Sequence, residues 1–386
     1  MKPTPPIDRV ALEAILAPGS SGRMLPSEAY VSEEVLAWER EHFFARSWVC
    51  AGRATLIAEA GARHATSVGG EPVILVRGSD GAARGYFNVC RHRGHELLAC
   101  GASAKRSAIH CPYHAWTYDL DGRLTHTPRF DPPAGFEPSE HGLVPVGVAE
   151  WAGWLFVNTS GDAIPFAQHL GAFAALLEPW QPERLVVGAT HDYESPTNWK
   201  LPIENYQECY HCSAIHPELC AVSPPESGDN YTLPGAWVGG TMDLATHAET
   251  MSFDGHSNGV ALPGLDDVQR RQVIYVGLFP NMLISAHPDY VMTHRIEPVR
   301  AGYSRVECQW LFDPDAVARP DFDPAYATEF WDLTNRQDWA ACESVQRGLE
   351  SRGYRPGPFS LDEDAVCQWV QLVARSYLAG ELAVDS

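Results

Sequence analysis

The sequence is poor in cysteine, in basic residues and in long apolar runs, and each shortage excludes a class of protein. Ten cysteines in 386 residues are too few for a scaffold held by disulfides. The 28 Lys and Arg stand against 49 Asp and Glu, a net charge of −21, which disfavours nucleic acid because its binding depends on neutralising phosphates. No stretch reaches the ~20 apolar residues of a membrane helix, and residues 1–23 show no signal-peptide pattern. We therefore expect a cytoplasmic protein with reduced thiols, built from roughly two or three domains.

Two short motifs, each with one cysteine and one histidine, are the most informative part of the chain. Cys90-x-His92 is followed, after eighteen residues, by Cys111-x-x-His114. A Cys2His2 zinc site has the same donors, but zinc fingers usually keep the cysteines together and the histidines together. One cysteine and one histidine in each half instead favour a Rieske [2Fe–2S] cluster, in which two imidazoles replace two thiolates on one iron. Such a cluster transfers single electrons.

A second metal site is indicated by two histidines and two acids close together. If the segment is a helix, Glu204, Glu208 and His211 lie at i, i+4 and i+7 on one face. His216 follows five residues later, and Pro217 biases it away from helical geometry. A second Glu-x-x-His pair, as in di-iron bundles, is absent. A mononuclear iron site with two histidines and one carboxylate fits better, and it requires one further acid.

The further acid is expected on the helix that follows Pro324. Its apolar stripe recurs at helical spacing at Phe330, Thr334, Asp338, Ala341 and Val345. Asp338 is the one charge on this face, and an unpaired buried carboxylate is costly. Iron is one candidate partner for Asp338, and an arginine such as Arg295 is the other.

The secondary-structure pattern divides the chain in two. Short β runs between Trp48 and Asn158 predict a small β domain with the metal motifs in neighbouring loops. We expect its strands at residues 72–77, 85–89, 107–111, 116–118 and 149–157, with a hairpin turn at Asp121-Gly122. After Ser160, helices and strands are mixed.

The second part begins and ends with helices. An N-terminal helix is expected from Ser32 to Phe44, with the Ser32 hydroxyl as its cap. Residues 166–177 predict a helix, 218–270 a long loop, and 360–363 a capping box before the last helix. Strands are expected at residues 184–193, 272–278, 282–286, 290–297 and 304–312.

Taken together, these motifs resemble the α subunits of Rieske non-haem iron oxygenases. The likeness adds Asn198-Trp199-Lys200 to the two metal motifs and runs from about Leu25 to the C-terminus. The sequence at residues 208–211, 331–338 and 346–349 resembles that of the betaine and carnitine branch, which includes glycine betaine and stachydrine demethylases. The resemblance implies an α+β protein: an N-terminal segment (1–46), an all-β Rieske domain (47–160) and a catalytic domain (161–386) with an antiparallel sheet wrapped by helices in a helix-grip, START-like fold.

The resemblance also assigns roles to residues. It implies that the cluster is held by Cys90, His92, Cys111 and His114, and mononuclear Fe(II) by His211, His216 and Asp338. Glu208 matches an acid that, in a homotrimer, bridges a cluster histidine of one subunit to an iron histidine of the next. Electrons would come from NAD(P)H through a separate flavin/[2Fe–2S] reductase or ferredoxin, since the sequence has no GxGxxG motif of its own.

The implied reaction is the O₂-dependent N-demethylation of a small quaternary ammonium or betaine substrate with release of formaldehyde. An aromatic-ring hydroxylating dioxygenase is the alternative, and a pure electron carrier is disfavoured by the second metal motif. A quaternary ammonium group prefers an aromatic cage, for which Tyr206, Tyr231, Trp237 and Phe253 are candidates. The basic residues around the cluster loops are either a docking patch for an acidic electron donor or a solvated face: Arg91, Arg93, Lys105 and Arg106.

Overall fold

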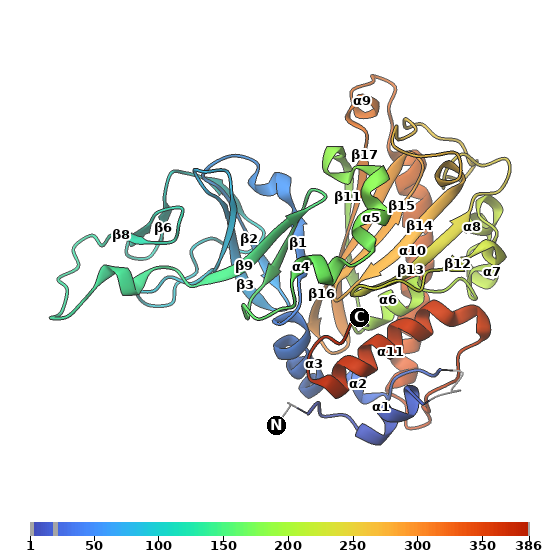
Figure 1. The fold of residues 1–386 in the computed structure, drawn as a ribbon, viewed down its shortest axis with the longest axis horizontal. Coiled ribbons are helices and arrows are strands. Elements are labelled where there is room, and N and C mark those ends of the chain that lie inside the picture. The colour runs from blue at the N-terminus through green and yellow to red at the C-terminus, as the bar shows by residue number, and fades with distance from the viewer. Residues whose placement is uncertain (1–3, 18–21, 385–386) are drawn as a thin grey trace. The chain divides into compact units, whose positions relative to one another are not determined.

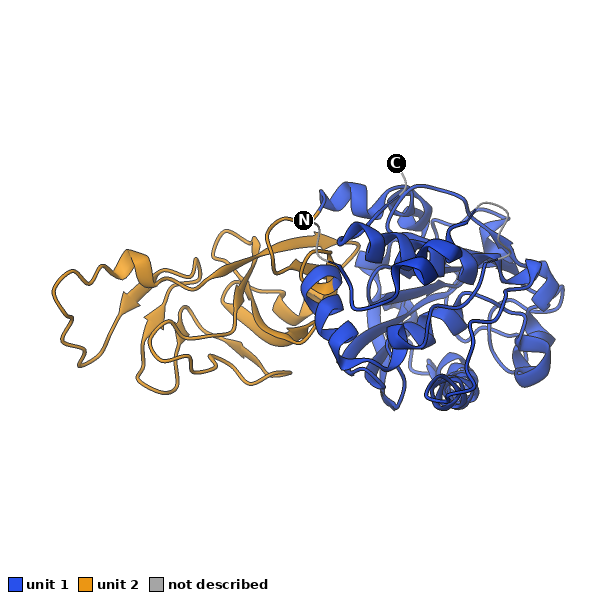
Figure 2. Ribbon diagram, turned by 90° about the horizontal axis from the view of Figure 1, so that it is seen from below, with its two compact units in different colours: residues 1–43, 164–386 blue, residues 44–163 orange. Residues whose placement is uncertain are grey.

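The computed structural model describes residues 4–17 and 22–384 and divides into two compact units. One unit is Phe44–Ala163, and the other combines Met1–Phe43 with Ile164–Ser386 (Figure 2). We call them the small unit and the large unit and describe each by itself.

The small unit is an all-β structure of two antiparallel sheets (Figure 1). The larger sheet has the order β1-β10-β9-β4-β3-β2-β5 and the smaller one β6-β7-β8. The strands are β1 (Val49–Arg53), β2 (Ala62–Val68), β3 (Glu71–Arg77), β4 (Ala83–Phe87), β5 (Ser103–Lys105), β6 (Ile109–His110), β7 (Thr117–Tyr118), β8 (Leu124–His126), β9 (Pro145–Trp151) and β10 (Trp154–Asn158).

The turns of the small unit confirm one prediction made from the sequence and correct another. The predicted hairpin at Asp121-Gly122 is confirmed, since β7 and β8 pair on either side of it. The single strand predicted at 149–157 is wrong, because Ala152 and Gly153 take φ values of 50° and 82° and turn β9 back into β10. Positive φ costs alanine more than glycine, so Ala152 gives no turn signal in the sequence.

The large unit is built on a seven-stranded antiparallel sheet with the order β11-β17-β16-β15-β14-β13-β12. Its strands are β11 (Val186–Ser195), β12 (Asp229–Asn230), β13 (Trp237–Asp243), β14 (Gln272–Leu278), β15 (Met282–Ala286), β16 (Tyr290–Arg300) and β17 (Tyr303–Phe312). The helices are α1 (Arg9–Ile15), α2 (Glu28–Val31), α3 (Glu33–Glu39), α4 (Phe166–Leu170), α5 (Phe173–Leu177), α6 (Lys200–Tyr206), α7 (Cys212–Ile215), α8 (Pro217–Val222), α9 (Pro314–Val317), α10 (Ala325–Leu349) and α11 (Asp364–Ala379).

Helix α10 covers one face of this sheet. Its Phe330 and Trp331 share a buried cluster with Tyr290 and Met292 of β16 and Trp310 of β17. Burying such aromatic side chains is the main stabilising contribution of a core. The α+β class predicted from the sequence is confirmed.

Several helix predictions are confirmed at their caps. The Ser32 hydroxyl accepts a hydrogen bond from the Val35 amide, and α3 continues as a π-helical turn to Phe44. The capping box of Ser360 and Glu363 is formed. In the part of the chain that the structure describes, no helix is long and apolar enough to cross a membrane.

Two predictions for the large unit need correction, and glycine explains both. The helix predicted at 166–177 breaks at Gly171, where φ is 51° and a Cβ would lie 2.1 Å from the Pro234 carbonyl oxygen. The loop predicted at 218–270 contains strand β13, whose Gly239 lets the neighbouring strand approach, since a Cβ there would lie 2.0 Å from the Tyr275 carbonyl oxygen. Glycines at consecutive positions hide the alternation that marks a strand.

Candidate metal centres

The four cluster candidates lie on two loops of the small unit. Cys90 and His92 follow β4, and Cys111 and His114 lie between β6 and β7. The loops are closed by backbone bonds, from Cys90 N to the His95 oxygen at 2.8 Å and from Cys111 N to the Trp116 oxygen at 2.8 Å. The rings of His92 and His114 are 4.7 Å apart, so the two loops bring both histidines together.

The surroundings of these residues suit a cluster. Burial and the neighbouring Cys111 thiol raise the pKa of Cys90, against the opposing hydrogen bond from Tyr118. The Tyr118 hydroxyl lies 3.3 Å from the Cys90 sulfur, and His92 stacks on Trp116 at 4.7 Å. The Nδ1 atom of His92 is buried without a hydrogen-bond partner among the described residues. Two adjacent thiols and two adjacent imidazoles, one with an unused buried nitrogen, fit the ligand set of a Rieske cluster.

The second set of candidates lies in the large unit, in a turn and not in the helix predicted for it. Helix α6 ends at Tyr206 and α7 begins only at Cys212. Glu208 and His211 therefore lie in the connecting turn, and His216 lies between α7 and α8. Glu204, still in α6, is directed elsewhere, where it accepts a hydrogen bond from the Tyr30 hydroxyl at 3.0 Å. The prediction that Glu204, Glu208 and His211 share a helical face is wrong.

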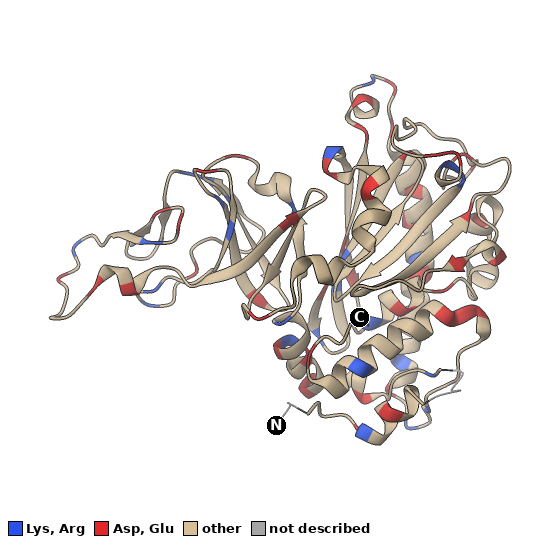
Figure 3. Ribbon diagram, in the orientation of Figure 1, with Lys and Arg blue, Asp and Glu red and all other residues tan. Residues whose placement is uncertain are grey.

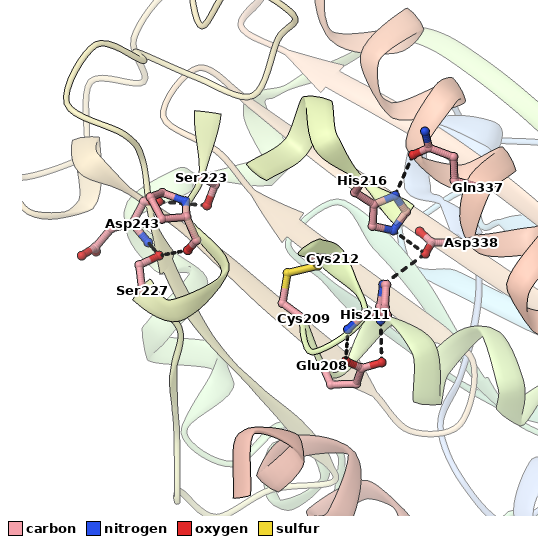
Figure 4. Close-up of a disulfide and its surroundings, with 11 residues drawn as sticks. Glu208, Cys209, His211, Cys212, His216, Ser223, Ser227, Asp243, Gln337 and Asp338 are labelled. Atoms are coloured by element: carbon pink, nitrogen blue, oxygen red, sulfur yellow. Dashed lines mark hydrogen bonds and ion pairs between the residues drawn. A yellow bond between two sulfur atoms is a disulfide. The ribbon is translucent and has the colours of Figure 1, made fainter. Parts of the chain in front are cut away.

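His211, His216 and Asp338 nevertheless converge on one point (Figure 4). Their ligand atoms all lie within 4.8 Å of one another. The Asp338 Oδ1 atom is 2.8 Å from His216 Nε2 and 3.4 Å from His211 Nε2. Two imidazole nitrogens and one carboxylate from separate segments are the donor set of a mononuclear non-haem iron site with open positions.

Both imidazoles are oriented by a second side chain on the opposite ring nitrogen. Glu208 Oε1 lies 2.5 Å from His211 Nδ1, and its Oε2 accepts the His211 backbone N–H at 3.1 Å. Gln337 Oε1 lies 2.7 Å from His216 Nδ1. Such partners fix the tautomer that leaves Nε2 free for a metal. The role of Gln337 was missed, although it directly precedes Asp338 in the sequence.

The charges of this group stabilise one another. Burial lowers the pKa of His211, but hydrogen bonds to Asp338 and Glu208 outweigh it and raise the pKa to about 9. Burial raises the pKa of Asp338, but its bonds to both imidazoles outweigh burial and lower it. The carboxylate is thereby kept in its charged, metal-binding form.

Helix α10 carries Asp338 to the histidines, and its buried face differs from the predicted stripe. Phe330 and Thr334 are buried as predicted, whereas Val345 is 43% exposed. The buried face continues at Trp339, Cys342, Gln346 and Leu349. The alternative partner of Asp338, Arg295, instead forms an ion pair with Glu307 at 3.3 Å.

The Asn198-Trp199-Lys200 motif anchors the start of α6. Asn198 donates from its amide to the carbonyl oxygens of Tyr30 at 3.1 Å and Ala301 at 2.7 Å. The Trp199 indole and the Lys200 ammonium donate to Glu39 at 2.8 Å and 2.6 Å. Because Lys200 and Glu39 are fully buried, this ion pair is satisfied only in one geometry. The motif thus fixes the helix that leads into the His211 turn.

A cavity of 690 Å³ opens beside the three candidate ligands. Of the four aromatic residues predicted to surround the substrate, only Tyr206 lines it. Tyr231 and Trp237 pack on each other at 6.1 Å, and Phe253, half exposed, packs on Phe330 at 5.6 Å. The aromatic lining is completed by three residues that sequence reasoning missed, Tyr210, Tyr275 and Trp331.

The charged lining of this cavity has one sign. It includes the carboxylates of Glu208, Glu226, Asp229, Asp338, Asp362 and Asp364 and, among the described residues, no Lys or Arg. The hydroxyl of Tyr275 is buried without a hydrogen-bond partner in the described part of the chain. The cavity therefore combines aromatic faces, negative charge and a free hydroxyl group.

Cys209 and Cys212 are joined in a disulfide on either side of His211 (Figure 4). The sequence predicts reduced thiols, so this bond departs from expectation. The other eight cysteines form no disulfide among the described residues.

Two family comparisons cover most of the chain. Residues 47–147 match the Rieske [2Fe-2S] domain, and residues 182–379 match the catalytic domain of the ring hydroxylating alpha subunit. The four cluster candidates lie in the first range and the three iron candidates in the second.

Curated relatives and solved structures agree with these matches. The chain is 30% identical over 368 residues to the glycine betaine monooxygenase oxygenase subunit of Pseudomonas aeruginosa, covering 87% of this chain and 84% of that one. It is 38% identical over 336 residues to the carnitine monooxygenase oxygenase subunit of Acinetobacter baumannii, covering 86% of each. A quaternary ammonium Rieske monooxygenase, described with carnitine oxidation and inter-subunit electron transfer, superposes with a TM-score of 0.82 at 26% identity, covering 96% of this chain and all of that one, 100%.

Proposed function

The chain belongs to the Rieske non-haem iron oxygenases, as a ring-hydroxylating α subunit, and from that premise we propose that it N-demethylates a quaternary ammonium substrate of the betaine type. When bound, the [2Fe–2S] cluster supplies single electrons and the mononuclear iron supplies O₂ activation. We assign the cluster to Cys90, His92, Cys111 and His114, and the iron to His211, His216 and Asp338. Hydroxylation of an N-methyl group gives a carbinolamine, which collapses to the demethylated amine and formaldehyde.

The lining of the cavity is the observation that carries this proposal. A methylated ammonium group binds to aromatic faces through cation–π attraction, and Tyr206, Tyr275 and Trp331 supply such faces. Tyr206 is held in place, because its hydroxyl donates to the Ile284 carbonyl oxygen at 2.7 Å. Carboxylates without a balancing Lys or Arg in the described lining add long-range attraction for a cation. We therefore place the ammonium group among these rings, with one methyl directed at the His211–His216–Asp338 set.

An aromatic-ring hydroxylating dioxygenase is less well supported. A hydrocarbon ring gains from apolar surface, whereas six carboxylates in the lining must remain solvated or paired with a cation. The relatives at 30% and 38% identity are betaine and carnitine enzymes.

We further propose a homotrimer in the cytoplasm that takes its electrons from a separate NAD(P)H-dependent reductase. Glu208 suits a bridging role, since its carboxylate already holds His211 Nδ1 and is only partly buried, with 12% of the side chain exposed. Arg91 and Arg93 suit the docking of an acidic electron donor, because neither forms an ion pair in the described part of the chain.

The test is to supply the metal-loaded enzyme with a reductase, NADH and a panel of glycine betaine, stachydrine, carnitine, choline and indole, and to measure formaldehyde and O₂ uptake. We expect formaldehyde from at least one methylated ammonium compound, in equal amounts to the O₂ consumed. The Asp338→Ala protein, with its cluster intact, is the blank. Oxidation of indole, with no formaldehyde from any amine, would replace the proposal by the dioxygenase alternative.

A further inference from the structure

The Cys209–Cys212 disulfide encloses a candidate iron ligand. The two residues are three positions apart, with Cα atoms 4.9 Å from each other. Between them lies His211, and directly before them lies Glu208. A covalent bond at this place acts on both the ligand and the carboxylate that orients it.

The turn is already closed by its backbone before the sulfurs are considered. The Cys212 amide donates to the Cys209 oxygen at 3.1 Å, and the His216 amide donates to the Cys212 oxygen at 2.8 Å. The first bond holds the two cysteines opposite each other, and the second links Cys212 to the other candidate histidine. Because hydrogen bonds hold this arrangement, the sulfur–sulfur bond can break and form again without refolding of the turn.

The two sulfurs differ in access. Cys212 is 4% exposed and packs in a core cluster with Leu219 and Trp331, whereas Cys209 is only partly buried against the same cluster. Both line the 690 Å³ cavity. A small oxidant in the cavity therefore reaches Cys209 first, and Cys212 is in place to complete the bond.

We propose that Cys209 and Cys212 are a reversible redox modification site, in which a peroxide forms the disulfide and a dithiol reverses it. In the first step the Cys209 thiol and H₂O₂ give a sulfenic acid and water. In the second, the Cys212 thiol attacks the sulfenic sulfur, forming the S–S bond and releasing a second water. H₂O₂ is the two-electron reduction product of O₂, the oxidant that this family uses. This inference needs the metal site but not the ammonium substrate.

The disulfide state tightens the metal site. It restricts the turn that carries Glu208 and His211, while leaving Nε2 of His211 directed at Asp338. Reduction removes this covalent restraint but leaves the hydrogen bonds of the turn in place, so Glu208 and His211 move more and a bound metal dissociates faster. Loss of a group that orients a metal ligand changes metal affinity by about tenfold or more.

The experiment uses the full chain with its cluster in place and Zn²⁺ in the mononuclear site, because Zn²⁺ does not undergo redox chemistry. Samples are treated with H₂O₂, which catalase then removes, or with dithiothreitol. Free thiols are alkylated and located by mass spectrometry, and the transfer of Zn²⁺ to a coloured chelator is timed. Wild type is compared with Cys209→Ala, Cys212→Ala and the matched control Cys220→Ala, whose cysteine lies in the next helix, α8, and is free.

We expect peroxide to protect Cys209 and Cys212 from alkylation, and to slow Zn²⁺ release about tenfold in wild type and Cys220→Ala. Cys209→Ala and Cys212→Ala should release Zn²⁺ at the fast rate under both treatments. Cys209→Ala replaces the more exposed residue, so it remains informative if Cys212→Ala does not fold. Alkylation of both thiols after peroxide, or equal release rates in the two states of wild type, would overturn the inference. Neither result depends on turnover of any amine.

Discussion

At the scale of single residues, the iron site depends on which atom of each ring is already engaged. Glu208 occupies Nδ1 of His211 and Gln337 occupies Nδ1 of His216, so both Nε2 atoms are directed at Asp338. The sequence predicts the two histidines as ligands from their spacing and Asp338 from its place on a helix, and the structure brings the three together. It does not predict the contact of Gln337 with His216, because a glutamine beside an acid has no spacing signature. A side chain that orients a metal ligand from a distant segment is recognised only once the fold brings the two segments together.

Substitution of Asp338 should affect iron binding, whereas substitution of Asp332 on the same helix should not. In Asp338→Asn the charge that both imidazoles share is lost, so we expect iron content to fall by about tenfold or more and turnover to disappear. Asp332→Asn is the matched control, since Asp332 lies on the same helix but accepts from Tyr193 at 2.8 Å and from Arg336 at 2.7 Å. Metal analysis and formaldehyde release measure the two effects. Full iron occupancy in Asp338→Asn would remove Asp338 from the ligand set.

At the scale of elements, periodicity predicts the sheet better than the ligand turn. Strands β14 and β15 begin and end at the predicted residues because they are short, apolar and bounded by turns. The helix predicted through Glu208 stops at Tyr206, although Glu204, Glu208 and His211 have helical spacing. His211 and His216 contact Asp338, and Glu208 contacts His211, so tertiary contacts override the local pattern. Strand β13 was not predicted because its two glycines weaken the alternation of apolar and polar residues that marks a strand.

The buried carboxyl of α6 predicts a particular pH dependence of stability. Burial raises the pKa of Glu204 to about 8, against the opposing hydrogen bond from Tyr30 and the charge of Lys200. In the unfolded chain a glutamate titrates near ~4.3, so between these values the folded protein holds a proton that the unfolded chain has lost. The stability contributed by Glu204 is therefore present below pH ~4.3 and is lost as the pH rises towards about 8.

Glu204→Gln should remove this dependence, since an amide does not titrate. We expect the free energy of unfolding of wild type to fall relative to the variant as the pH rises from about 5 to about 8, by up to ~1.4 kcal/mol for each step of one in pH. Urea denaturation across this range measures the difference. Glu329→Gln replaces an exposed acid of α10 and should follow wild type. Parallel curves for Glu204→Gln and wild type would show that Glu204 is ionised in the folded protein.

At the scale of the whole molecule, the net charge is distributed unequally between the two units. Residues 44–163 contain eleven Lys and Arg and eleven Asp and Glu, so the entire net charge of −21 lies in the large unit. Figure 3 shows the acidic residues, in red, spread over its helices and loops. The acidic electron donor proposed above would therefore meet less repulsion at the neutral small unit than at the acidic large unit.

Electron transfer between copies is tested by combining two inactive chains. Cys111→Ser should lack the cluster and keep the mononuclear iron, whereas Asp338→Ala should lack the iron and keep the cluster. Neither turns over alone, because each lacks one of the two centres. If electrons cross from the cluster of one subunit to the iron of the next, co-expressed chains in a cyclic oligomer should regain about a quarter of the wild-type rate. A quarter is the share of interfaces at which random assembly places an intact cluster beside an intact iron site. The mass in solution should be three times 42.5 kDa. A verified mixed trimer without activity would show that electrons pass from cluster to iron within one chain. The bridging role of Glu208 would then be wrong, because no electron would cross between neighbouring subunits.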